Sequence, residues 1–75
     1  MKMNTLELFN ESLEMVAEEF TKISNGDTST TPEIVALLML NTSAIGAKLV
    51  EEGFSDAEVS KMIDDKLDPI VGGTE

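Results

Sequence analysis

Apolar residues recur along the first third of this chain at intervals of three and four, the spacing that places them on one side of a helix. Asn4 and Glu7 have the spacing of a capping box, and Asn25-Gly26 provides a glycine at which a helix can end. We therefore predict a helix over residues 5–25. Its apolar seam comprises Leu6, Phe9, Leu13, Val16, Phe20 and Ile23.

The second stretch, residues 32–52, is apolar around almost its whole helical circumference. Only Asn41 and Lys48 form a narrow polar seam. Its start carries Thr31, which can cap a helix, and Pro32, which the first turn of a helix tolerates. Because a helix that is apolar on nearly every side must be covered, we predict that this one lies buried between two others.

Gly46 lies inside this second helix, where glycine costs about 1 kcal/mol relative to alanine. Such a glycine indicates the close approach of another backbone, and the neighbouring Ser43 and Ala47 are also small. The approaching element is either the first or third helix or a second copy of the chain. The sequence leaves both open.

A third helix is predicted over residues 55–67. Ser55 and Glu58 have the spacing of a second capping box. We expect the helix to end before Pro69, since proline disfavours helical geometry at the preceding residue. Residues 70–75 are then expected to form a flexible tail. The apolar stripe of this helix comprises Val59, Met62, Ile63 and Leu67.

These elements predict an all-α fold, a small three-helix bundle that forms a single domain over residues 1–75. A chain of 75 residues buries only about 60–65% of its unfolded surface, and without cysteine or histidine it has no disulfide or usual zinc site to stabilise it. Because two short amphipathic helices can scarcely wrap the second helix, we expect a homodimer through that helix. The expected interface residues are Met39, Leu40, Ser43, Ala47 and Val50.

The chain carries fifteen acidic residues and five basic ones, a net charge of −10. This balance repels phosphates, so we expect no direct contact with nucleic acid. An acidic surface of this kind either keeps an apolar domain soluble or docks on a basic protein site. The first helix places an acidic face opposite its apolar seam, formed by Glu7, Glu11, Glu14 and Glu18.

No residue set in the sequence predicts catalysis. Paired carboxylates such as Glu51-Glu52 need burial or a polarising partner to separate their pKa values, and the chain has no His, Cys, Arg, Tyr or Trp to provide one. We therefore assign no catalytic residue, no metal ligand and no cofactor, and expect a protein that is not an enzyme.

The apolar run of the second helix covers 14 residues between Glu33 and Lys48, against the roughly 20 needed to cross a bilayer, so we expect no membrane span. The start of the chain lacks the apolar core of a signal sequence, and we expect a cytoplasmic location.

The function that these features favour is a non-enzymatic protein-interaction module, a small acidic adaptor or inhibitor that acts through helical apolar and acidic surfaces. The alternative is an acidic nucleic-acid mimic that inhibits a DNA- or RNA-binding protein. A third hypothesis is a small-molecule pocket at an oligomer interface.

Overall fold

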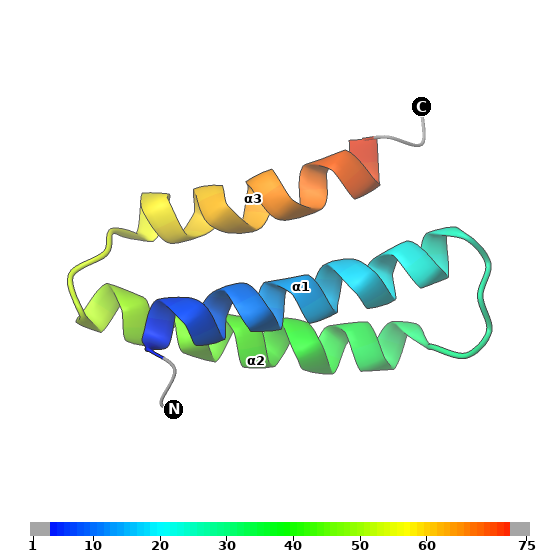
Figure 1. The fold of residues 1–75 in the computed structure, drawn as a ribbon, viewed down its shortest axis with the longest axis horizontal. Helices are drawn as coiled ribbons and strands as arrows, with labels where there is room; N and C mark the ends of the chain where they lie inside the picture. Colours follow the sequence, from blue (N-terminus) through cyan, green and yellow to red (C-terminus); the bar gives the residue numbers. More distant parts are fainter. Residues whose placement is uncertain (1–3, 73–75) are drawn as a thin grey trace.

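The computed structural model describes residues 4–72 of the chain. Three helices follow one another: α1 (Thr5–Ser24), α2 (Pro32–Glu51) and α3 (Asp56–Gly72). In Figure 1, α1 and α2 run antiparallel beside each other, and the chain then turns back so that α3 runs in the same direction as α1. The described residues contain no strand, and the predicted all-α three-helix fold is confirmed.

The side chains that were expected to start each helix do so. The Asn4 side chain accepts a hydrogen bond from the Glu7 N–H at 2.8 Å, and the Glu7 carboxylate accepts one from the Asn4 N–H at 3.3 Å. Thr31 caps α2, with proline at the next position. Ser55 and Glu58 exchange the same pair of bonds as Asn4 and Glu7. These caps satisfy N–H groups that would otherwise lack partners within the helix.

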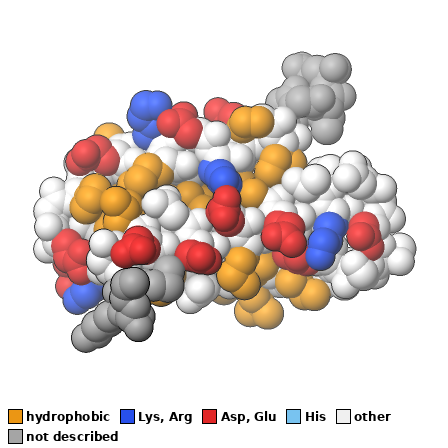
Figure 2. All heavy atoms as spheres, viewed as in Figure 1, with side chains coloured by type: hydrophobic (Ala, Val, Ile, Leu, Met, Phe, Trp, Pro, Cys, Tyr) orange, Lys and Arg blue, Asp and Glu red, His pale blue; other side chains and the backbone are white. Residues whose placement is uncertain are grey.

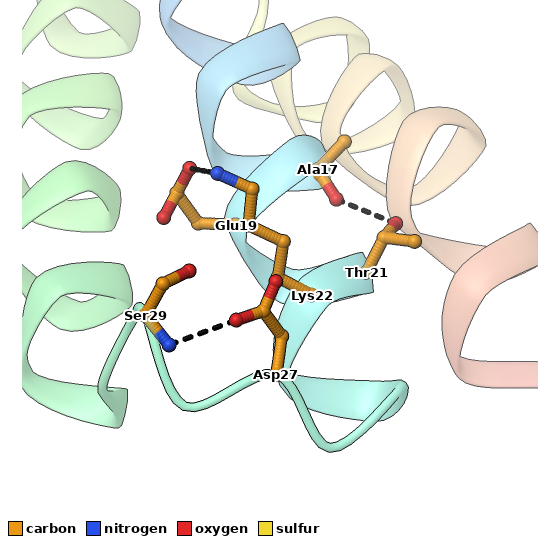
Figure 3. Close-up of polar contacts among 6 residues, drawn as sticks. All are labelled: Ala17, Glu19, Thr21, Lys22, Asp27 and Ser29. Atoms are coloured by element: carbon orange, nitrogen blue, oxygen red, sulfur yellow. Dashed lines mark hydrogen bonds and ion pairs between the residues drawn. The ribbon is translucent and has the colours of Figure 1, made fainter.

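Polar contacts hold the end of α1 and the loop after it (Figure 3). The Lys22 ammonium lies 3.1 Å from the Glu19 carboxylate within the helix. Gly26 follows with φ at +78°, a conformation that glycine adopts without steric cost. The Asp27 carboxylate then accepts a hydrogen bond from the Ser29 N–H at 2.8 Å. Bonds from the Ser29 hydroxyl and N–H keep the pKa of Asp27 below its usual value.

The core is built mainly from α1. Its predicted apolar seam is confirmed, since Phe9, Leu13 and Val16 are buried, and α2 and α3 add Leu49 and Val59. The expectation that α2 lies buried between the others is wrong, because α1 occupies that position. The apolar stripe of α3 packs back against the core that Phe9 and Leu13 form, so none of the described residues covers the far side of α2.

At Gly46 of α2, side chains of both other helices lie close to the backbone. A Cβ at this position would lie 3.0 Å from a methyl carbon of Val59 in α3 and 3.2 Å from the ring of Phe9 in α1. Of the two partners that the sequence left open for this close approach, the structure shows the chain's own helices. Glycine therefore sets the distance between α2 and its two neighbours.

A short chain of hydroxyl groups crosses the contact between α1 and α2. The buried hydroxyls of Ser12 and Thr42 are hydrogen-bonded to each other, and Thr42 also donates to the Leu38 carbonyl at 3.0 Å. Because a hydroxyl has one proton, Thr42 must accept from Ser12. The Asn41 amide donates to the Ser12 oxygen at 3.5 Å, at the edge of the contact. The hydroxyls of Ser12 and Thr42 are thus both satisfied.

The predicted end of the third helix at residue 67 is wrong, since α3 continues through Pro69 to Gly72. Proline cannot donate to the carbonyl of Asp65, but this residue is exposed, so water can satisfy the free carbonyl. Continuing the helix also aligns half-buried Ile70 with Ile63 and Leu67 on one face. Of the expected flexible tail, residues 70–72 are helical and residues 73–75 lie outside the described part.

Replacing Gly46 with valine should destabilise the fold by about 1–3 kcal/mol, because the new side chain has no room between Phe9 and Val59. Chemical denaturation followed by circular dichroism measures the effect. Ala57→Val is the matched control, because it adds a β-branched residue to an exposed helix position. Equal losses in the two variants would show that the close packing at Gly46 contributes nothing.

Thr42→Val should cost about 1–3 kcal/mol of unfolding free energy, because it leaves the buried Ser12 hydroxyl without its acceptor. The double variant Ser12→Ala/Thr42→Val removes both polar groups and should be less destabilised than the sum of the two single variants. A double-mutant cycle by urea denaturation gives this coupling. Additive effects would mean that the two hydroxyls do not interact in solution.

Candidate interaction surfaces

An open groove of about 590 Å³ runs between α1 and α3. Its apolar part comes from Leu13, which is buried, and Met62, which is half-buried. Figure 2 shows apolar side chains between these helices with acidic side chains around them. The residues lining the groove are Glu7, Asn10, Glu11, Leu13, Glu14, Met62, Asp65 and Lys66.

The rim of this groove carries an excess of negative charge, with four carboxylates and one lysine among the lining residues. Lys66 bridges the groove to Glu14, with 3.2 Å between the ammonium and the carboxylate. Asp65 pairs along α3 with Lys61 at 2.9 Å, and this contact raises the pKa of Lys61. Glu11 has no ion pair or side-chain hydrogen bond to any described residue. Exposed pairs contribute only about 0–1 kcal/mol each, so they are easily exchanged for a partner's charges.

All four residues of the expected acidic face are exposed on α1. Glu7, Glu11 and Glu14 line the groove, and Glu18 continues the same row beyond it. The spacing of these four glutamates in the sequence predicted that they form one row. The apolar floor beside the row was missed, because it forms only where Met62 of α3 meets Leu13 of α1.

The second surface is the outer side of α2, which faces away from α1. Leu37 and Leu40 are 66% and 68% exposed there, and Ala44 and Ala47 continue the exposed stripe. These four residues follow one another at intervals of three and four, the repeat of a helix that pairs with another helix. Apolar side chains are visible over α2 at the lower edge of Figure 2. We call these four residues the outer stripe.

The residues expected at a dimer interface fall on two sides of α2. Leu40, Ser43 and Ala47 are exposed, whereas Met39 and Val50 are half-buried. Three of the five line a shallow depression of about 230 Å³ against α3, namely Ser43, Ala47 and Val50. The expected interface therefore stays a prediction, and Leu37 and Ala44 are the outer-stripe residues that it omitted. Their three- and four-residue spacing was the signal that could have found them.

By length and composition, α2 is also the one helix in residues 4–72 that could cross a membrane. Only 17% of its apolar window is buried within the molecule, so α2 is not an ordinary core helix. Its Thr42 hydroxyl and Asn41 amide take part in the polar contact with α1. The apolar composition of α2 therefore leaves an exposed face that no other part of the described structure covers.

Among residues 4–72 there is no group of three or more His, Cys, Asp or Glu side chains placed to hold a metal ion. No protein-family model matches the chain, and no curated protein or solved structure matches it either. The functional argument therefore rests on the two surfaces: an acid-rimmed groove with an apolar floor, and an exposed apolar stripe. Both are suited to binding a helix or an extended segment.

The difference in burial between Leu49 and Leu37 provides a test of whether the outer stripe of α2 is exposed. Leu49→Ala should lower the unfolding free energy by about 2–5 kcal/mol, because Leu49 is fully buried. Leu37→Ala should change it by less than about 0.5 kcal/mol at dilute concentration, because this side chain lies in solvent. Urea denaturation of the two variants measures both. A large loss from Leu37→Ala in dilute protein would contradict the exposed position of the outer stripe.

Proposed function

We propose that this protein is a non-enzymatic protein-interaction module, a small acidic adaptor or inhibitor. The observation that carries the proposal is the groove between α1 and α3, where an apolar floor is flanked by carboxylates. A basic amphipathic segment has the matching chemistry. The stems of its lysine or arginine side chains pack on the half-buried Met62, above the buried Leu13, and their charged ends meet Glu7 and Glu11.

The charge of the whole chain supports the same partner class. With a net charge of −10, the protein attracts basic surfaces over distances of about one Debye length, roughly 8–10 Å at physiological salt. This attraction increases the association rate, while the apolar floor provides a contact that salt does not screen. The groove therefore combines recognition of a basic partner with a short-range apolar contact.

Self-association is the second part of the proposal. A second copy of the chain covers the outer stripe of α2 and completes the bundle as a homodimer. The exposed fractions of Leu37 and Leu40 support this, because contiguous exposed apolar residues mark interaction sites in soluble proteins. The groove and the outer stripe lie on different sides of the molecule. A dimer formed through α2 therefore leaves the groove of each copy accessible.

A nucleic-acid mimic is the alternative function. The row Glu7, Glu11, Glu14 and Glu18 places carboxylates about 5 Å apart along the axis of α1, as a helix with a rise of 1.5 Å per residue requires. A regular row of negative charges is what a basic nucleic-acid site binds. The groove is the better supported surface, since Lys66 neutralises the middle of the row by pairing with Glu14.

Two charge reversals on α1 separate these functions. The probe is a synthetic amphipathic peptide with lysines on one helical face and leucines on the other, titrated into the protein by calorimetry. Glu11→Lys should weaken binding by about five-fold or more, because Glu11 lines the groove. Glu18→Lys is the matched control: it makes the same change on the same helix face, beyond the groove.

A loss confined to the Glu11 variant supports groove docking. Equal losses in both variants, with affinity that falls steeply as salt is raised, would favour the nucleic-acid mimic instead. Absence of peptide binding to the unmodified protein at low salt would overturn the proposed docking surface.

A further inference from the structure

We infer that Lys66 determines which basic segments the groove accepts, by confining a partner's positive charges to the end of the groove that Glu7 and Glu11 form. This inference rests on the proposed docking function and specifies the charge pattern of the partner. It follows from the ion pairs of the groove, which cancel the negative charge at one end of the rim and leave it at the other.

The end of the groove at Glu14 is close to neutral. Lys66 of α3 reaches across to Glu14 of α1, with 3.2 Å between the ammonium and the carboxylate. Asp65 is the carboxylate that α3 adds to the rim, and it is paired with Lys61 at 2.9 Å. A positive charge from a partner therefore finds little attraction at this end.

The end of the groove at Glu7 and Glu11 keeps its negative charge. Neither carboxylate forms an ion pair with any of the described residues. Glu7 accepts a hydrogen bond from the N–H of Asn4, which is uncharged and leaves the charge of the carboxylate in place. The two glutamates are four residues apart, about 6 Å along the axis of α1. They offer two adjacent positions for cations.

Lys66 opposes a third cation even when its ion pair opens. The side chains of Lys66 and Glu14 are both exposed, so the pair adds little to the stability of the fold and a partner can separate it. A partner's lysine that replaces Lys66 at Glu14 leaves the Lys66 ammonium tethered nearby, within the length of its own side chain. The two like charges then repel each other, and this repulsion offsets the attraction of Glu14.

The partner that fits this pattern is an amphipathic helix with two basic residues three or four positions apart. Such residues lie on one side of a helix, at a spacing that matches Glu7 and Glu11. Its apolar side chains pack on Met62 of the groove. The position that would meet Glu14 carries a neutral residue, because a third positive charge there gains nothing while Lys66 is present.

Two synthetic amphipathic peptides of equal length test this pattern by calorimetric titration into the full chain. One carries lysines at positions i and i+4, and the other adds a third lysine at i+7, the spacing of Glu7, Glu11 and Glu14. Residues three and four apart share a helix face, so either orientation of the peptide presents one lysine to each carboxylate. The two peptides should bind the unmodified protein with affinities within about two-fold of each other.

Lys66→Gln should make the three-lysine peptide bind about three- to five-fold more tightly than the two-lysine peptide, because Glu14 is then free. Lys48→Gln is the matched control: it removes the same charge from an exposed pair on α2, away from the groove. A preference for three lysines in the Lys66 variant alone supports the inference. The same preference in both variants would assign the effect to net charge and overturn it.

Glu14→Gln gives a second measurement that leaves Lys66 unchanged. Lys66 then lacks its partner, so the three-lysine peptide should bind more weakly than the two-lysine peptide. Equal binding of the two peptides by both the Glu14 and the Lys66 variants would overturn the role of Lys66 and leave groove docking standing. If neither peptide bound the unmodified protein at low salt, the docking function would be overturned as well.

Discussion

The close approach of three helices around Gly46 is the constraint on which the rest of this structure depends. Without a side chain at this position, the Phe9 ring and the Val59 methyl groups come directly against the backbone of α2. Phe9 and Leu49 are fully buried beside this point, and Leu13 is nearly so. Because the largest apolar side chains of a small core meet here, the spacing set by one glycine determines how α1 and α3 lie on α2.

This arrangement decides which apolar surface is hidden and which is not. Since α3 returns to the core formed with α1, α1 becomes the central helix and the groove forms between α1 and α3. Within residues 4–72, the outer side of α2 is left without a neighbour. A 75-residue protein has too few residues to cover every apolar helix face, so exposed apolar surface is a consequence of its size as well as of its packing.

The two surfaces differ in the partner chemistry that suits them. The groove joins an apolar floor to carboxylates of α1 and α3, which suits a basic segment of another protein. The outer stripe of α2 consists of exposed leucines and alanines without charge, which suits an apolar surface. The two surfaces therefore differ in charge and in shape, and they lie on different sides of the molecule.

The sequence by itself determined the three helices, most of their ends and the inward face of α1. These features depend on neighbours three and four residues apart: the Asn4-Glu7 and Ser55-Glu58 caps, the glycine after α1, and the seam that includes Phe9 and Val16. Only the tertiary structure decided that α1, not α2, is central, that α3 continues past Pro69, and that Met62 lies beside the acidic row. The reason is physical: an almost uniformly apolar helix such as α2 has no periodicity to say which side is covered. Which side of α2 is buried is determined only by how the other helices pack against it in the folded structure.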